Sequence, residues 1–185
     1  MHVETFTSRM KIVDYHLKNE RLEDALSNAR QLRRDLMCEM VVETDQVCWP
    51  LYYELRSLHG LERWSDFIAL MHRYYTLLLS MGPTDNAYAH SLAMEAAANT
   101  GNFDDFTHWA RQCFEFRIID QDIEALQSAL HTARALLDVS RRLDLFPILL
   151  DNLSEVAKDH HETELAELVC EWADHSREHL RRQAQ

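Results

Sequence analysis

The sequence predicts an all-α protein, and three observations support this prediction. Glycine and proline are scarce, with three residues of each in 185, so the turns that an all-β fold requires are few. Apolar residues recur at steps of three and four along almost the whole chain, which is the period of an amphipathic helix. Short polar breaks, such as 18–20 and 99–102, separate these segments and favour antiparallel helical hairpins. We expect a single domain, 1–185.

Each predicted element is placed by its apolar stripe and its breaks. One stripe runs from Leu22 to Met40, a second from Phe67 to Leu78, a third from Phe103 to Phe114 and a late one from Leu165 to Trp172. The predicted helices are nine, at 4–18, 20–41, 48–59, 62–80, 85–99, 103–118, 121–142, 145–158 and 162–182.

Local signals place several helix ends. Thr84 and Asn102 carry side-chain oxygens that suit N-caps, and Gly101 suits a left-handed residue after a helix. Proline is tolerated in a first turn, which is where we expect Pro50 and Pro147.

An internal repeat of about 40 residues is visible. Four segments share core positions at steps of three, four and three, with offsets of 42, 39 and 42. The fourth is degenerate, since it places Asn152 and Glu155 where the others are apolar. The aligned sets are Leu22, Ala25, Ala29 and Leu32; Trp64, Phe67, Met71 and Tyr74; Phe103, Phe106, Ala110 and Cys113; and Leu145, Ile148, Asn152 and Glu155.

The segment from Tyr88 to Phe116 resembles a unit of the tetratricopeptide-repeat and related helical-hairpin solenoid superfamily. It has small residues at Ala93, Ala96 and Ala97, a glycine turn at Gly101 and a second helix with Trp109 and Ala110. The period departs from the usual ~34 residues of that family. The resemblance implies a short right-handed solenoid with hairpins 4–41, 48–80, 85–118 and 121–158 and a capping helix, 162–182.

The resemblance also implies that the first helices of the hairpins line a concave groove that binds a segment of another protein. Trp, Tyr and Arg are frequent interface anchors, and Trp49, Tyr52 and Arg56 share one face of their helix. The alternative is that Trp49 and Tyr52 pack against the next hairpin. Asp14 and Glu95 favour a partner segment with a basic or amide group. The predicted partner-binding residues are Trp49, Tyr52, Arg56, His59, Tyr88, Ser91 and Glu95.

Eleven histidines raise a second function class, a metal-binding helical protein. Glu171, His175 and His179 share one helix face, but they span ~12 Å, so all three cannot hold one ion. The alternative to a metal site is that these side chains form a polar helix face in contact with solvent. We therefore expect no metal and no cofactor. The candidate metal ligands are His160, His161, Glu171, His175 and His179.

The net charge of −12 raises a third class, an acidic mimic that competes for a basic or nucleic-acid-binding protein. Residues 81–185 hold nineteen Asp and Glu against nine Lys and Arg, which disfavours direct nucleic-acid binding. No catalytic motif is found, so we expect no enzyme. The four cysteines are expected to be buried free thiols.

The cellular location and the oligomeric state are inferred from targeting segments and from the apolar residues of the last predicted helix. With no signal or membrane segment visible, we expect a cytoplasmic protein. Leu165, Leu168 and Trp172 either cap the solenoid or form a two-fold interface, which leaves a homodimer open. His16, His72, His108 and His131 are expected at groove edges or helix crossings rather than in an active site.

Overall fold

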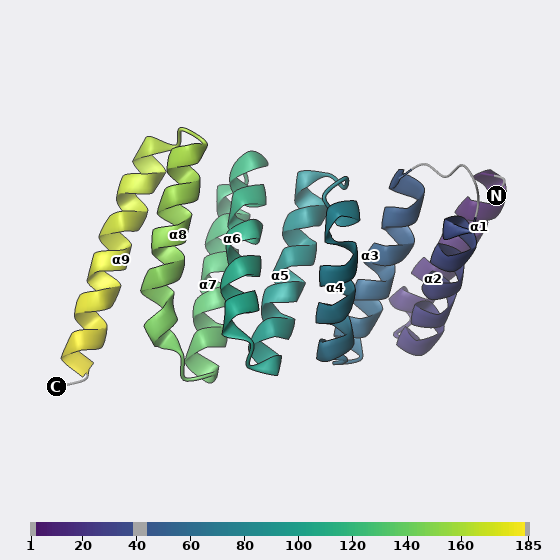
Figure 1. Ribbon diagram of the computed structural model, residues 1–185, viewed down its shortest axis with the longest axis horizontal. Coiled ribbons are helices and arrows are strands. Elements are labelled where there is room, and N and C mark those ends of the chain that lie inside the picture. Colours follow the sequence, from purple (N-terminus) through teal and green to yellow (C-terminus); the bar gives the residue numbers. More distant parts are fainter. Residues whose placement is uncertain (1–2, 39–43, 184–185) are drawn as a thin grey trace. The chain divides into compact units, whose positions relative to one another are not determined.

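The computed structural model describes residues 3–38 and 44–183, and these residues form only helices and turns (Figure 1). The all-α prediction is therefore confirmed over those two ranges. Their helices are α1 (Val3–Lys18), α2 (Leu22–Met37), α3 (Thr44–Gly60), α4 (Trp64–Leu78), α5 (Pro83–Thr100), α6 (Phe103–Ile119), α7 (Ile123–Val139), the short 3-10 helix η1 (Leu143–Leu145), α8 (Phe146–Asp159) and α9 (Thr163–Gln183).

The helices form two compact units, residues 1–82 with α1 to α4 and residues 83–185 with α5 to α9. In unit 1, α1, α2, α3 and α4 pack in succession. In unit 2, α5 packs on α6, α6 contacts both α7 and α8, and α8 packs closely on α9. The predicted packing of neighbouring helices is confirmed within each unit, whereas the single domain 1–185 stays a prediction.

One turn geometry recurs at six helix ends and makes the hairpins alike. In each, a residue with positive φ follows the helix, and the next amide donates to the carbonyl five residues back. Gly101, with φ 71°, fulfils the predicted role, but the other five positions are not glycine. They are Glu20, Glu62, Gln121, Arg141 and His161, with φ between 56° and 63°.

The repeat is confirmed at its first three segments and is out of register at the fourth. Leu22, Trp64 and Phe103 each begin a helix, and α8 begins at Phe146 rather than Leu145. Ile148 is 47% exposed, whereas Leu149 and Leu153 are fully buried. The true alignment is therefore shifted by one residue, because η1 occupies the positions before α8.

Two predicted helix-end roles are wrong because the helices begin earlier than expected. α3 starts at Thr44, which places Pro50 inside the helix rather than in its first turn. α5 starts at Pro83, so Thr84 is helical, and its hydroxyl donates to Asp120 Oδ2 at 2.7 Å. The cap at Asn102 is confirmed, since its side chain accepts from the Asp105 amide at 3.2 Å. α2 is described to Met37, and its predicted end at 41 lies outside the described residues.

Unit 1 holds a buried ionic network between α2, α3 and α4. Glu54 is 1% exposed and accepts from the Nε atoms of Arg30 and Arg33, each at 2.8 Å. Arg33 also donates to the Tyr74 hydroxyl at 2.9 Å. Tyr74 has non-helical backbone angles, so α4 is kinked where it meets this network.

The cysteines correct another expectation. Cys48 and Cys113 are buried free thiols as expected, but Cys38 and Cys170 are exposed. Cys113 donates to the carbonyl of Ala87 at 3.3 Å, and burial raises the pKa of its thiol to about 11. The two units therefore each contain one buried and one exposed thiol.

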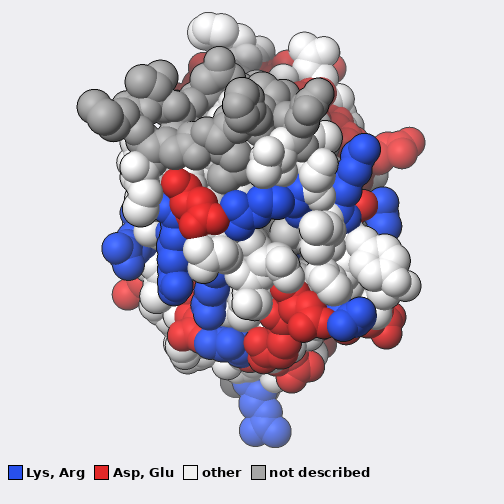
Figure 2. Space-filling view, turned by 90° about the vertical axis from the view of Figure 1, so that its right-hand side faces the viewer, with Lys and Arg blue, Asp and Glu red and all other residues white. Residues whose placement is uncertain are grey.

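Charged side chains of both signs are interspersed on the face formed by the N-terminal end of unit 1 (Figure 2). Arg9 pairs with Asp35 at 2.7 Å, and Arg21 pairs with Asp24 at 2.7 Å. Over the described residues of this face, the mixing leaves no uninterrupted basic surface of the kind typical of phosphate-backbone binding. Over the described residues, no helix has the length and apolarity needed to cross a membrane.

Candidate functional site

The α3 face predicted to bind a partner is partly buried. Tyr52 is only 8% exposed, and its ring meets the Trp49 ring edge to face, with 5.9 Å between centroids. The Arg56 guanidinium carbon lies 5.9 Å from the Tyr52 ring centre. His59 packs edge-on against Trp64 of α4 at 5.1 Å. Trp49, at 39%, and Arg56 are the members of this set with exposed side chains.

The remaining predicted binding residues lie on α5, in unit 2. Tyr88 is 39% exposed, and Ser91 and Glu95 are half-buried. Because α3 and α5 belong to different units, a groove that joins their faces stays a prediction.

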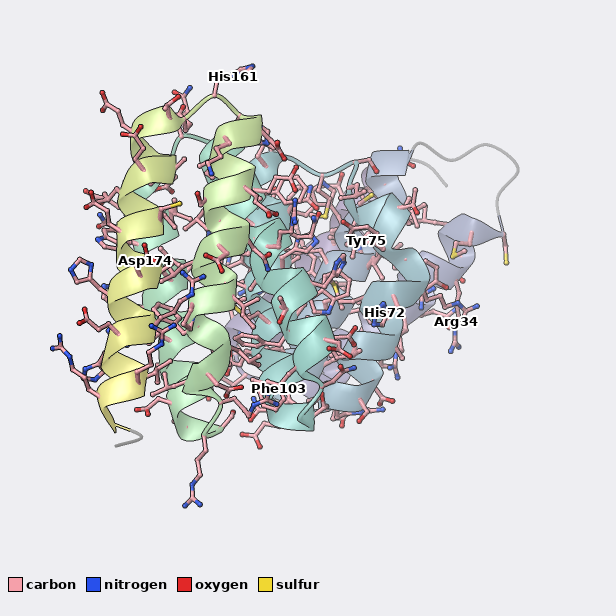
Figure 3. All side chains as sticks on the ribbon, turned by 60° about the vertical axis from the view of Figure 1, so that its left-hand side comes forward. Arg34, His72, Tyr75, Phe103, His161 and Asp174 are labelled. Carbon is pink, nitrogen blue, oxygen red and sulfur yellow. The ribbon has the colours of Figure 1, made fainter. Side chains whose placement is uncertain are left out.

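The candidate metal ligands serve other contacts. His160 Nε2 lies 3.7 Å from Glu115 Oε1, and His161 occupies the left-handed position at the tip of the α8 to α9 turn (Figure 3). His175 Nδ1 lies 2.7 Å from the carbonyl oxygen of Glu171, one turn earlier in α9. Within 3–38 and 44–183, no three His, Cys, Asp or Glu side chains gather as a metal site requires.

His175 and His179 instead line a half-open cleft in unit 2. This α7–α9 cleft has a volume of about 580 Å³, within the range of roughly 300–1,000 Å³ typical of ligand-binding clefts. Three helices contribute its lining: Gln127, Leu130, His131 and Arg134 from α7; Phe146 and Leu150 from α8; and Trp172, His175, Ser176 and His179 from α9.

Helical spacing explains why these side chains meet. Gln127, His131 and Arg134 follow one another at steps of four and three, so they share one face of α7. Leu126, Ala133 and Leu137 are buried on the core side of the same helix. The face from Gln127 to Arg134 covers two turns, about 10 Å at 1.5 Å per residue. The cleft is therefore a trough about two helical turns long.

The contact between α8 and α9 fixes which face of α9 borders the cleft. Ala166, Val169 and Ala173 are buried on α9. The hydroxyl of Ser154 donates to the carbonyl oxygen of Ala166 at 3.1 Å. Arg177 binds Asp151 of α8 and Asp174 of α9, and the hydrogen bond to Asp151 raises the pKa of its guanidinium. These bonds set the rotation of α9.

The cleft combines an apolar floor with cationic and polar walls. Leu130 and Leu150 are buried at its base, while Trp172 remains 39% exposed. The guanidinium carbon of Arg134 lies 5.8 Å from the ring centre of Phe146. No Asp or Glu is among the lining residues. This arrangement can enclose a large apolar side chain and offer hydrogen bonds to an anionic neighbour.

Sequence analysis assigned Trp172 to a cap or a two-fold interface, and His175 and His179 to a candidate metal site. It did not identify the cleft that these residues line. His131, which was expected at a groove edge or a helix crossing, lies on the wall of this cleft. The available signal was the polar stripe of Gln127, His131 and Arg134 opposite the leucines of the same helix. Its partner stripe on α9 is about 40 residues away, and only the tertiary packing brings the two stripes together.

Comparisons with known proteins do not extend this description. No protein-family model, no curated protein and no solved structure matches the chain significantly.

Proposed function

We propose that this chain is a non-enzymatic protein-interaction module, and that the α7–α9 cleft binds a short segment of a partner protein. The single observation that carries the proposal is the cleft itself, a half-open trough with an apolar floor and a partly exposed tryptophan on its wall. Tryptophan is among the residues most often found as an interface anchor, because it contributes a large apolar area and one hydrogen-bond donor.

The resemblance to tetratricopeptide-like hairpin proteins supports this location. In that superfamily, the first helices of successive hairpins line the binding groove. α7 begins the fourth predicted hairpin, so it corresponds to a groove-lining helix, and α9 is the predicted capping helix that follows this hairpin. The packing of consecutive helices within unit 2 is compatible with membership of this superfamily, which is part of the proposal.

The test compares two tryptophans with equal exposure. Trp172 lines the α7–α9 cleft and Trp49 lies on the α3 face, and each is 39% exposed. Peptides are selected on the full chain from a random library displayed on phage, and their dissociation constants are measured by fluorescence polarisation. Loss of an anchor tryptophan costs about 2 kcal/mol, so Trp172→Ala is expected to weaken binding about tenfold or more. Trp49→Ala is expected to change binding less than about twofold.

Circular dichroism and thermal melting establish that both variants are folded before affinities are compared. Equal affinity in Trp172→Ala and the wild type, or a failure to select any peptide, would overturn the proposal. A loss confined to Trp49→Ala would place the binding site on the α3 face and also reject the α7–α9 cleft.

A further inference from the structure

The lining of the α7–α9 cleft has a charge opposite to that of the unit around it. Residues 83–185 contain nineteen Asp and Glu and nine Lys and Arg. The lining contains none of the nineteen acids, but it has Arg134 and three histidines. The absence of these acids from the lining, together with the presence of Arg134, favours an anion rather than a cation as the occupant of the cleft.

Two acidic side chains of α9 beside the cleft have partners elsewhere. Asp174 accepts from Arg177 at 2.9 Å, and Glu178 accepts from Arg182 at 2.6 Å. On α8, Asp151 is bound by Arg177. Among the described residues, no carboxylate lies within 4.0 Å of the Arg134 guanidinium, whose contact is with the Phe146 ring. Its hydrogen-bond donors are therefore available to a ligand.

The charged and titratable groups that face the cleft come from two of its three helices. α7 supplies His131 and Arg134, α9 supplies His175 and His179, and α8 supplies only the apolar Phe146 and Leu150. The basic side chains therefore lie on the two walls formed by α7 and α9, and no carboxylate is among the residues that line the cleft.

The floor restricts the kind of anion. Leu130, Phe146 and Leu150 form an apolar base beside Trp172, which a small inorganic anion would leave unfilled. A trough about two turns long suits a peptide that places a large apolar side chain on the floor and a carboxylate against the wall. A phosphate or a free small acid would use the wall alone.

We propose that the partner segment bound in the α7–α9 cleft is an acidic peptide, in which Asp or Glu lies close to a Leu, Phe or Trp anchor. The inference rests on the proposed function, because it specifies the occupant of the same cleft. Arg134 supplies the positive charge that meets the carboxylate, and His131, His175 and His179 border the cleft with ring nitrogens that can form hydrogen bonds.

Two synthetic peptide pools of equal length supply the probes. One contains Leu, Phe, Trp, Asp and Glu, and the other replaces Asp and Glu by Asn and Gln. Binding to the full chain is followed by fluorescence polarisation and by the indole N–H resonances of the four tryptophans. A charge-assisted hydrogen bond contributes about 1.5–3 kcal/mol, so the acidic pool should bind about tenfold more tightly or better. The Trp172 resonance should shift.

Matched variants separate the contributions to binding. Arg134→Gln is expected to remove most of the preference for the acidic pool, whereas Arg111→Gln, which changes an exposed arginine paired with Glu155 outside the cleft, should preserve it.

The outcomes distinguish the two proposals. If both pools bind equally and shift Trp172, the cleft is a binding site but its occupant is not selected for acidity, and only this inference fails. If neither pool shifts Trp172, the proposed function fails as well. If inorganic phosphate or acetate displaces the acidic pool at submillimolar concentration, the anion alone is the ligand, and the peptide inference is rejected.

Discussion

His90 is a buried histidine whose environment excludes its charged form. The side chain is fully buried on α5, beside the rings of Trp109 and Phe116, and its Nδ1 lies 2.6 Å from the Asn86 carbonyl oxygen. Burial is the main reason that its pKa falls to about 4, with the nearby His108 adding a smaller effect in the same direction. The native state therefore keeps His90 neutral at pH values where the unfolded chain binds a proton.

This pKa predicts a specific loss of stability in acid. Between pH 6.5 and 4, the unfolded state binds the proton that the native state refuses, so the free energy of unfolding decreases as the pH falls. The total decrease is about 3 kcal/mol, at roughly 1.4 kcal/mol per pH unit. Urea denaturation at pH 7.5 and 4.5 should show a smaller decrease for His90→Gln than for the wild type. Equal decreases in the two proteins would contradict the prediction.

Glu54 is the residue of unit 1 whose loss we expect to cost most. Replacing it by alanine leaves Arg33, which is largely buried, and Arg30 without their shared carboxylate. Breaking a buried ion pair costs about 3–5 kcal/mol, which urea denaturation of Glu54→Ala would measure. The more accessible pair of Arg9 and Asp35 provides the control, since solvent screens this pair and Asp35→Asn should cost much less than Glu54→Ala. A similar cost for both variants would count against the network's role.

At the scale of the elements, the turn that recurs at six helix ends predicts how a change of its left-handed residue alters stability. An L-residue in the left-handed conformation costs about 1–2 kcal/mol, which glycine avoids. Glu62→Gly and Gln121→Gly should therefore each raise the free energy of unfolding by about 1 kcal/mol, and Gly101→Ala should lower it by a similar amount. Gly82→Ala is the control, because an added Cβ meets nothing within 4 Å there. Thermal and urea unfolding measure these changes. If neither Glu62→Gly nor Gln121→Gly raises the free energy of unfolding, the energetic role of the turn is refuted.

The elements also show how far local sequence signals reach. Several helices were predictable because their apolar periodicity is strong, as in α2, where Ala25, Leu26, Ala29, Leu32 and Leu36 are buried along one stripe. Their ends were less predictable. Pro50 is a first-turn signal, yet α3 extends six residues before it, and Thr84 donates to Asp120 from within α5. At Pro50 the residues that precede it in α3, and at Thr84 the tertiary contact with Asp120, outweigh the local signal.

The candidate site was less predictable than the helices for a related reason. Periodicity identifies the polar face of α9 that carries His175 and His179, but it does not identify what that face borders. The missing information is the packing of α8 between α7 and α9, which depends on the register of Phe146 and Leu149. Because the predicted alignment of the fourth repeat is off by one residue, it did not identify Phe146 and Leu150 as the floor of the cleft.

At the scale of the whole molecule, the accessibility of the thiols predicts a biphasic reaction. Cys38 and Cys170 are exposed and should react within minutes with Ellman's reagent in the native protein. Cys48 and Cys113 are buried, and the raised pKa of Cys113 further disfavours its reactive thiolate. Absorbance should therefore report two thiols in native buffer and four in denaturant, and loss of Cys38 or Cys170 should remove one from the fast phase. Four fast thiols in native buffer would contradict the burial.

The distribution of these thiols has a practical consequence. Cys38 belongs to unit 1 and Cys170 to unit 2, so a maleimide pair of donor and acceptor dyes would label one site on each unit without any engineered cysteine. Energy transfer between the dyes would then report the separation of the two units in solution, molecule by molecule. Adding an acidic peptide to the labelled protein would reveal whether occupation of the cleft is transmitted to the other half of the chain.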